Sequence, residues 1–266
     1  MKCKICNENN CLEPFVKNIT KCINCESLYD MSIQHEEIPV IASINNNLKL
    51  SVQKKISKLI AQSYLVYLKK KIKVDFKNAL DIGCGFGDFI EELNKIGVKA
   101  SGIESDANTV KNAKDNVHYG LFDESYDSAI KYDLISINQA LYYFEDSFAI
   151  IKKISSLLEI NGIILIATVN TASSFRQKHK IWTQGCKICL GNKIWKNFNK
   201  FGLKCVDITS YDDDLYINFF LRKTGLMSNT KFMRNTLLYL SLMKKMIVVK
   251  EDGIDNFVLL QKVRLV

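Results

Sequence analysis

The chain has 266 residues, 47% of them hydrophobic, and a formal net charge of +9 at pH 7. This length suits one α/β domain with additions rather than two full domains. The chain lacks a run of about 18 uncharged apolar residues, which excludes an ordinary membrane-spanning helix. Nine cysteines and an amino terminus without the pattern of a signal peptide indicate a reducing compartment, so we expect a cytoplasmic protein.

Two closely spaced pairs of cysteines stand near the start of the chain. They are Cys3 with Cys6 and Cys22 with Cys25. This spacing is typical of a structural zinc ion held by four thiolates in a short ribbon, with scattered free thiols as the alternative. Cys11 lies between the pairs and is not needed as a ligand. Because the predicted ribbon lobe, residues 1–35, buries little apolar surface, a metal would supply the missing free energy of folding.

Residues 36–77 are predicted to form a helical linker or lid after the ribbon. The apolar spacing from about Leu48 to Lys71 fits one long helix. This part of the chain is strongly basic, because residues 49–77 hold nine lysines against the single acid Asp75.

A glycine-rich turn between a strand and a helix follows. The strand ends at an acid and leads into alternating glycines, namely Asp81, Gly83, Gly85 and Gly87. Glycines in such a turn permit positive φ and let a ligand approach the backbone closely. Residues 89–97 then have helical spacing, and a second strand over 98–103 leads to Glu104. The pattern predicts a cofactor site in which Glu104 binds ribose hydroxyls.

With these residues the sequence resembles the class I S-adenosylmethionine-dependent methyltransferases, whose first motif reads acid-x-Gly-x-Gly-x-Gly and whose second strand ends in a ribose-binding acid. Asp81 and Glu104 match those two positions. In dinucleotide sites the third glycine comes later. The resemblance covers roughly residues 78–211. It implies an α/β fold with a Rossmann-like methyltransferase sheet within residues 78–266.

The resemblance extends to later elements. It implies strands at residues 132–137 and 160–168 with a helix at 148–158 between them. Residues 256–263 are predicted as the closing strand, after a helical insertion at about 212–255 whose amphipathic pattern includes seven basic residues over 222–250. We expect this insertion to cap the methyl-acceptor site. A helix on a membrane surface is the alternative, as is packing against the domain or a second subunit.

The implied cofactor is S-adenosylmethionine. The resemblance assigns its binding to Asp81, Gly83, Cys84, Gly85, Phe86, Gly87, Glu104, Ser105, Phe122, Asn138 and Gln139. Two departures from the family pattern change what these positions do. Leu121 and Phe122 stand where an acid often lies near the adenine, so we expect an apolar contact there. Asn138 and Gln139 follow the fourth strand where many relatives have a histidine, so that base is missing.

The segment after the fifth strand is predicted to line the acceptor pocket. Residues 171–206 carry Arg176 and seven lysines without an acid, which favours an anionic acceptor, with solvated lysines as the alternative. Among the three histidines, His179 is the candidate general base, ahead of His35 and His118. Tyr142 and Tyr143 are predicted pocket walls. Cys186 and Cys189 are interpreted as an ordinary pair with metal or redox chemistry as the alternative, and Cys84 and Cys205 as buried fillers.

Three functions are compatible with this pattern. The preferred hypothesis is O-methylation of a small anionic acceptor, such as a sugar, sugar nucleotide or phosphorylated metabolite in surface-polysaccharide biosynthesis. The alternative is an RNA base methyltransferase, favoured by the net charge of +9. A non-catalytic zinc-ribbon interaction protein is the least favoured, because Asp81, the glycine turn and Glu104 are intact. The sequence does not set the oligomeric state.

Overall fold

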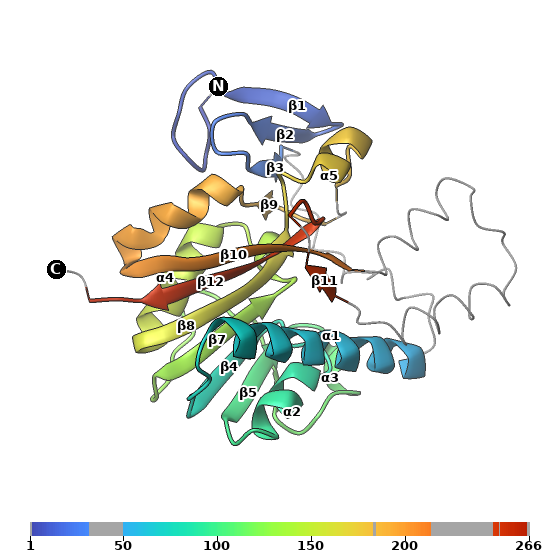
Figure 1. The fold of residues 1–266 in the computed structure, drawn as a ribbon, viewed down its shortest axis with the longest axis vertical. Helices are drawn as coiled ribbons and strands as arrows, with labels where there is room; N and C mark the ends of the chain where they lie inside the picture. Colours follow the sequence, from blue (N-terminus) through green and yellow to red (C-terminus); the bar gives the residue numbers. More distant parts are fainter. Residues whose placement is uncertain (1, 32–49, 183–184, 214–246, 250, 265–266) are drawn as a thin grey trace, which may run out of the picture.

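The computed structural model describes residues 2–31, 50–182, 185–213, 247–249 and 251–264. These residues form two β-sheets with helices packed around the larger one (Figure 1). The smaller sheet lies at the amino-terminal end of the molecule, and of the four predicted metal ligands only Cys22 belongs to one of its strands.

The larger sheet has eight strands. In chain order they are β4 (Asn78–Ile82), β5 (Lys99–Glu104), β6 (Val117–Tyr119), β7 (Tyr132–Asn138), β8 (Leu158–Val169), β10 (Leu203–Asp213), β11 (Ile247–Val249) and β12 (Asp255–Lys262). Their order across the sheet is β11-β10-β12-β8-β7-β4-β5-β6. The strands from β4 to β8 pair in parallel, whereas β12 is antiparallel to both β8 and β10. The predicted Rossmann-like α/β sheet is confirmed.

Successive residues of β8 face two different layers, as the period of a strand requires. Ile164 and Ile166 belong to a buried cluster with residues of α4 (Ser147–Leu157) and the 3₁₀ helix η3 (Asn192–Phe201). Ile163 and Leu165 belong to a second cluster with residues of α1 (Leu50–Lys71) and α2 (Asp88–Asn94). Because both faces are covered, the strands are apolar on both sides.

Helix α1 is packed into the core of the larger domain. The ring of Tyr67 stacks on Phe257 of β12 with centroids 4.2 Å apart, and Tyr64 meets the same ring edge-on at 5.5 Å. The Tyr67 hydroxyl donates to Asp207 of β10 at 2.6 Å. The predicted helix from about Leu48 therefore forms one layer of the domain. Residues 32–49, which include His35 and the rest of the predicted lid, lie outside the described residues.

The smaller sheet joins the amino-terminal residues to a strand from the larger domain. Its strands are β1 (Leu12–Val16), β2 (Ile19–Cys22), β3 (Leu28–Asp30) and β9 (Ile188–Cys189), in that order. β9 follows α5 (Ser174–His179), so the ribbon completes its sheet with a segment that comes after β8. Sequence periodicity did not predict this pairing, because β9 has only two residues.

Short helices connect the remaining strands: α3 (Ala107–Val110) lies between β5 and β6, and the 3₁₀ turn η2 (Leu141–Tyr143) follows β7. The prediction of a helical insertion at 212–255 is wrong where the residues are described, because residues 212–213 end β10 and residues 247–249 form β11, which pairs with it. Residues 214–246 lie outside the described part of the chain. No described helix combines the length and apolar character needed to cross a membrane.

Candidate functional site

The glycine turn after β4 has the left-handed backbone that its sequence predicts. The φ angles are 68° at Gly83, 56° at Gly85 and 78° at Gly87. A Cβ at Gly83 would lie 2.7 Å from the Cβ of Ala140, so the turn approaches the segment after β7 closely. A Cβ at Gly85 would meet no atom within 4 Å among the described residues. Gly85 therefore borders open space at the carboxyl edge of the sheet, where open α/β sheets bind ligands.

Glu104 lies directly against the turn. One oxygen of its carboxylate accepts the Gly85 amide at 2.9 Å, and the other accepts the Asp106 amide at 2.8 Å. An ionised carboxylate is acceptor-only and retains free lone pairs beside such bonds. Glu104 is therefore fixed by two backbone donors while it can still accept hydroxyl protons, as ribose binding requires.

Asp81 is a buried carboxyl at the end of β4. Burial raises its pKa to about 7, although the Ser136 hydroxyl, which donates to it at 2.6 Å, lowers the pKa; the nearby charge of Glu104 raises it further. A buried carboxylate without a cation is costly. The position therefore favours a ligand that brings a positive charge, such as the amino-acid end of S-adenosylmethionine.

The other predicted cofactor residues surround the turn. Cys84 is buried against Gly102, at which a Cβ would lie 2.6 Å from the Cys84 sulfur. Lys54 of α1 lies 5.7 Å from the ring centroid of Phe86. Phe122 is buried with its ring 5.0 Å from that of Tyr126, and Ser105 is exposed. The apolar side chain of Phe122 agrees with the expectation of an apolar adenine contact, and the assignment of these residues to the cofactor stays a prediction.

The turn after β7 is built around Asn138 and Gln139. The Asn138 side-chain oxygen accepts the Ala167 amide at 3.0 Å. Gln139 has a left-handed φ of 53°, and its side chain is held at both ends. Its Oε1 accepts from the Tyr142 hydroxyl at 2.8 Å, while its Nε2 donates to Tyr211 at 3.0 Å and to Asp255 at 3.3 Å.

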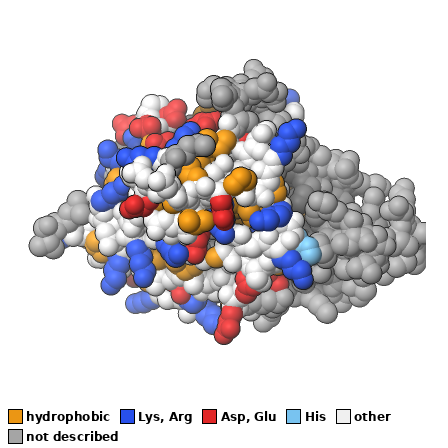
Figure 2. All heavy atoms as spheres, turned by 90° about the horizontal axis from the view of Figure 1, so that it is seen from above, with side chains coloured by type: hydrophobic (Ala, Val, Ile, Leu, Met, Phe, Trp, Pro, Cys, Tyr) orange, Lys and Arg blue, Asp and Glu red, His pale blue; other side chains and the backbone are white. Residues whose placement is uncertain are grey.

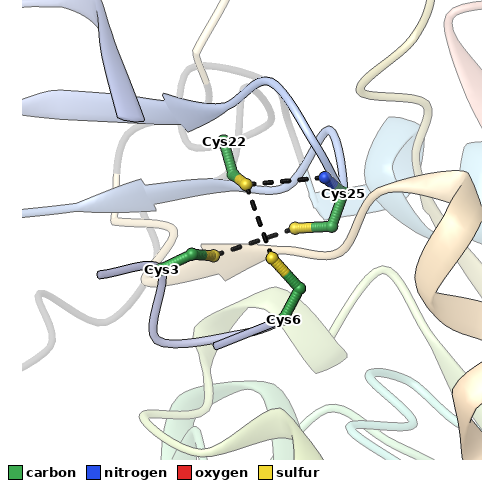
Figure 3. Close-up of side chains that lie close together, drawn as sticks. All are labelled: Cys3, Cys6, Cys22 and Cys25. Carbon is green, nitrogen blue, oxygen red and sulfur yellow. Dashed lines mark hydrogen bonds between the residues drawn. The ribbon is translucent and has the colours of Figure 1, made fainter. Parts of the chain in front are cut away.

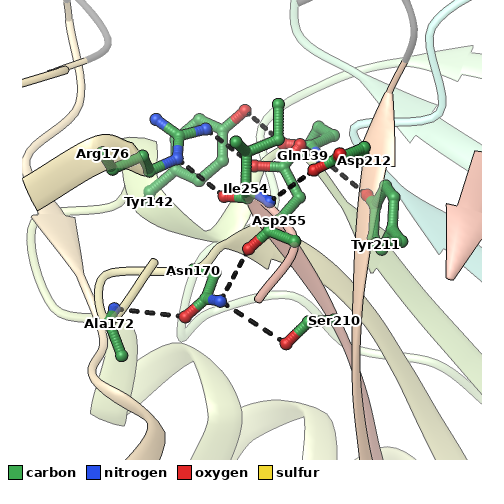
Figure 4. Close-up of polar contacts among 11 residues, drawn as sticks. Gln139, Tyr142, Asn170, Ala172, Arg176, Ser210, Tyr211, Asp212, Ile254 and Asp255 are labelled. Carbon is green, nitrogen blue, oxygen red and sulfur yellow. Dashed lines mark hydrogen bonds and ion pairs between the residues drawn. The ribbon is translucent and has the colours of Figure 1, made fainter. Parts of the chain in front are cut away.

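This turn belongs to a larger polar network at the carboxyl edge of the sheet (Figure 4). Arg176 is buried and forms an ion pair with Asp255 at 2.8 Å. Burial raises the pKa of Asp255, and the charge of Arg176 opposes that rise. Arg176, predicted as a cation of the acceptor wall, thus has its charge balanced by Asp255. The sequence could not show this pairing, because the two residues are far apart along the chain and on separate elements.

Among the described residues, histidine occurs at positions 118 and 179. His118 lies on β6 and is exposed. His179 ends α5 and is exposed, with its ring 4.7 Å from that of Phe175. α5 follows β8 and lies beside the ribbon, where Lys21 donates to Gln177 at 3.0 Å. The role of His179 as the base stays a prediction.

The four predicted metal ligands lie together (Figure 3). One atom from each of Cys3, Cys6, Cys22 and Cys25 lies within 4.8 Å of every other. The Cys3 and Cys25 sulfurs are 3.9 Å apart, and those of Cys6 and Cys22 are 3.7 Å apart. Tetrahedral zinc with bonds of about 2.3 Å places its sulfurs about 3.8 Å apart. The side chains therefore fit a four-thiolate zinc site.

Cys11 is the fifth sulfur at this cluster. Its sulfur is 3.4 Å from that of Cys22 and donates to the Glu8 carbonyl at 3.2 Å. Backbone amides donate to the ligand sulfurs, from Ile5 to Cys3 and from Cys25 to Cys22 at 3.4 Å each. Burial raises the pKa of the Cys25 thiol. A metal would stabilise the thiolate there.

The ribbon is docked on the larger domain. Cys186 and Cys189 are buried in a cluster with Phe15, Ile19 and Leu28 of the ribbon. This placement agrees with their interpretation as an ordinary packed pair.

The glycine turn and Glu104 lie together at the carboxyl edge of a Rossmann-like sheet, and comparison with known proteins identifies the class. A family model described as "Methyltransferase domain" matches residues 52–203, which is more than half of the chain. The chain therefore belongs to this methyltransferase family, whose fold is that of the class I S-adenosylmethionine-dependent enzymes.

The individual relatives have low sequence identity to this chain and match only part of it. The ubiquinone biosynthesis O-methyltransferase of Coxiella burnetii is 26% identical over 121 residues, which span 42% of this chain and 52% of that protein. The enzyme with the same description from Pelagibacter ubique is 30% identical over 123 residues, which span 39% of this chain and 51% of that protein. The chain thus spans about half the length of these relatives. The YcgJ protein of Bacillus subtilis has the same fold, with a TM-score of 0.52 at 12% identity over 77% of this chain and 99% of that one.

Proposed function

We propose that the protein transfers the methyl group of S-adenosylmethionine to a hydroxyl oxygen of a small molecule. The observation that carries this proposal is the open space beside Gly85, next to the Glu104 carboxylate, in a chain that belongs to a methyltransferase family. S-adenosylmethionine supplies an electrophilic methyl group on its sulfonium sulfur. The protein must then align the acceptor with that methyl group and accept the hydroxyl proton.

Each residue of the cradle has a defined role in this proposal. The Glu104 carboxylate binds both ribose hydroxyls, since the Gly85 and Asp106 amides already hold it in place. Asp81 lies at the amino-acid end and balances the ammonium group, which offsets the cost of its burial. The open side of Gly85 admits the ligand next to the backbone.

The choice of oxygen as the acceptor atom rests on the relatives from Coxiella and Pelagibacter, which are described as O-methyltransferases. The finer hypothesis of an anionic sugar in surface-polysaccharide biosynthesis has support only from basic charge. That support is reduced by the Arg176–Asp255 ion pair, which balances one of the cations assigned to the acceptor. We retain His179 as the proposed base, because it lies on the segment that follows β8.

We also propose that the ribbon holds one structural zinc ion. Four sulfurs at tetrahedral spacing support a closed site with no open position for catalysis. Zinc would contribute stability to a lobe whose own apolar core is small.

An RNA acceptor is the second candidate, and net charge favours it. The face of the molecule in Figure 2 shows basic side chains dispersed among acidic and apolar ones, without a continuous basic stripe on its described surface. A dispersed pattern of this kind favours a small acceptor.

The proposal is tested by incubating the zinc-loaded protein with S-adenosylmethionine labelled on its methyl group and three acceptor sets: hydroxylated aromatic compounds, sugar nucleotides and total RNA. We expect label in a small molecule, with base-stable ether linkage. In that reaction His179→Ala should lower kcat by roughly two to four orders of magnitude. His118→Ala is the matched control, because His118 is an exposed histidine on β6 and lies outside the segment assigned to the acceptor. Label in RNA alone would show that the proposed small-molecule acceptor is wrong, while the proposal that the protein transfers methyl groups would stand.

A further inference from the structure

We infer that Ser27 and β9 couple the metal site to the turn after β7, so that metal loading orders the side of the site that contains Gln139 and leaves the side that contains Asp81 and Glu104 unchanged. This inference rests on the proposed function for the meaning of the two sides. The observations that carry it are a continuous series of contacts from the Cys25 sulfur to the Gln139 side chain.

The first contacts join the metal knuckle to the residue after β9. The Cys25 sulfur lies 3.3 Å from the Ser27 hydroxyl oxygen, and the same oxygen accepts the Gly191 amide at 2.9 Å. With zinc bound, the Ser27 hydroxyl would donate to the Cys25 thiolate. Ser27 is completely buried. Gly191 packs so closely on the knuckle that a Cβ there would overlap the Cys25 carbonyl oxygen. The knuckle and the chain after β9 therefore cannot separate without breaking these contacts.

The next contacts cross from the ribbon to η2. β3 pairs with β9, with Leu28 opposite Cys189 and Tyr29 opposite Ile188. Lys187, the residue before β9, uses both of its backbone groups as a bridge. Its carbonyl accepts the Asp30 amide at 3.0 Å, and its own amide donates to the Tyr142 carbonyl at 2.7 Å.

The last contacts hold the turn after β7, to which Gln139 belongs. Tyr142 is buried in one cluster with ribbon residues, and its hydroxyl donates to Gln139 at 2.8 Å. Gln139 has a left-handed φ, which costs a non-glycine residue energy and needs such support. Ala140 follows it and lies against Gly83. The position of this turn thus depends on contacts from the ribbon.

The cofactor cradle has separate support. Glu104 is held by Gly85 and Asp106, and Asp81 by Ser136, so these bonds lie within β4, β5, β7 and the adjoining loops. Loss of the ribbon contacts should therefore affect the two sides unequally. Coupling predicts a loss of order in the turn after β7 while the bonds of Glu104 and Asp81 are kept, whereas general unfolding would break both.

The test compares amide hydrogen exchange in the zinc-loaded protein with that in the protein after zinc is removed by a chelator. We expect residues 139–143 and the Lys187 amide to exchange roughly tenfold faster or more without zinc, since each lost hydrogen bond changes local opening by about that factor. Amides of β4 should be unchanged. Equal exchange at 139–143 in the two states would overturn the inference.

Two variants test the contacts with all four cysteines in place. Ser27→Ala removes the shared hydroxyl with little change in volume, and Gly191→Ala forces β9 off the knuckle. Both should retain about one zinc per chain and show faster exchange at Lys187 and 139–143. Lys193→Ala is the matched control, because it removes only the exposed ion pair with Glu26. If Ser27→Ala and Gly191→Ala both exchange like Lys193→Ala, the inference is wrong. Binding of S-adenosylhomocysteine to each variant, measured in parallel, reports separately on the proposed function.

Discussion

At the scale of single residues, Gly85 differs from other left-handed glycines in what lies beside it. Gly85 and Gly97 both have positive φ and both would place a Cβ in open space, but only Gly85 borders the cofactor cradle. Alanine at either position should destabilise the fold by about 1–2 kcal/mol, because of the left-handed backbone.

Only Gly85→Ala should weaken binding of S-adenosylhomocysteine, the product of the cofactor. We expect a loss of roughly one to two orders of magnitude, since a methyl group forced into a packed contact costs about 1–3 kcal/mol. Calorimetric titration of both variants is the measurement. Equal affinities in Gly85→Ala and Gly97→Ala would show that this space is not the cofactor site.

Asp81 should make stability depend on pH when no cofactor is bound. Its pKa is raised to about 7 in the folded protein from 3.8, because the carboxyl is buried. Between these values the folded protein keeps a proton that the unfolded chain has released. The free energy of unfolding should therefore fall as pH rises through this window, by up to about 1.4 kcal/mol per pH unit.

Urea denaturation at several pH values between about 4 and 7 measures this effect. Asp81→Asn keeps the shape of the side chain and should remove this part of the fall. Asp115→Asn, at an exposed position, should follow the wild type. A wild-type slope preserved in Asp81→Asn would assign the pH dependence to other groups.

The sequence predicts single residues well where local pattern and function coincide. Asp81, the three glycines and Glu104 are recognisable because a strand, a turn and a second strand fix their relation. The ion pair of Arg176 could not be predicted in this way. Its charge predicted a cation in the wall of the acceptor pocket, but its partner Asp255 comes from β12. A single sequence contains no signal for such a pairing.

At the scale of elements, Phe257 joins α1 to two strands. Its ring stacks between Tyr67 and Tyr211, with centroid distances of 4.2 Å on each side. Phe257→Ala should lower the free energy of unfolding by about 3–5 kcal/mol, as truncation of buried aromatic residues does. Urea denaturation is the measurement, and Val206→Ala, at a position 45% exposed on β10, should change it by less than about 0.5 kcal/mol. A small effect at Phe257 would mean that α1 packs elsewhere.

Long elements follow from periodicity, and short ones do not. The helix to Lys71, predicted from apolar periodicity, agrees closely with α1, and the strand at 132–137, implied by the family resemblance, agrees closely with β7. β9 escaped prediction because two residues cannot establish a period and its partner β3 is far away in the chain. The same reason explains why the docking of the ribbon was not foreseen.

At the scale of the whole molecule, the proposed zinc ion would join the two cysteine pairs of the ribbon. Elemental analysis should find about one zinc per chain. Cys3→Ser should reduce this content and destabilise the ribbon, since one of four ligands is lost. Cys11→Ser is the matched control and should retain full content, even though its sulfur lies 3.4 Å from Cys22. Loss of zinc in Cys11→Ser with retention in Cys3→Ser would reassign the ligands.

The proposed function requires that the protein bind S-adenosylmethionine beside Gly85 and Glu104. Calorimetric titration with S-adenosylhomocysteine measures this binding. We predict one site per chain in the wild type, an affinity about one to two orders of magnitude weaker in Glu104→Ala, and no change in Glu124→Ala, which removes an exposed acid. Absence of binding in the folded wild type, or unchanged affinity in folded Glu104→Ala, would contradict the claim.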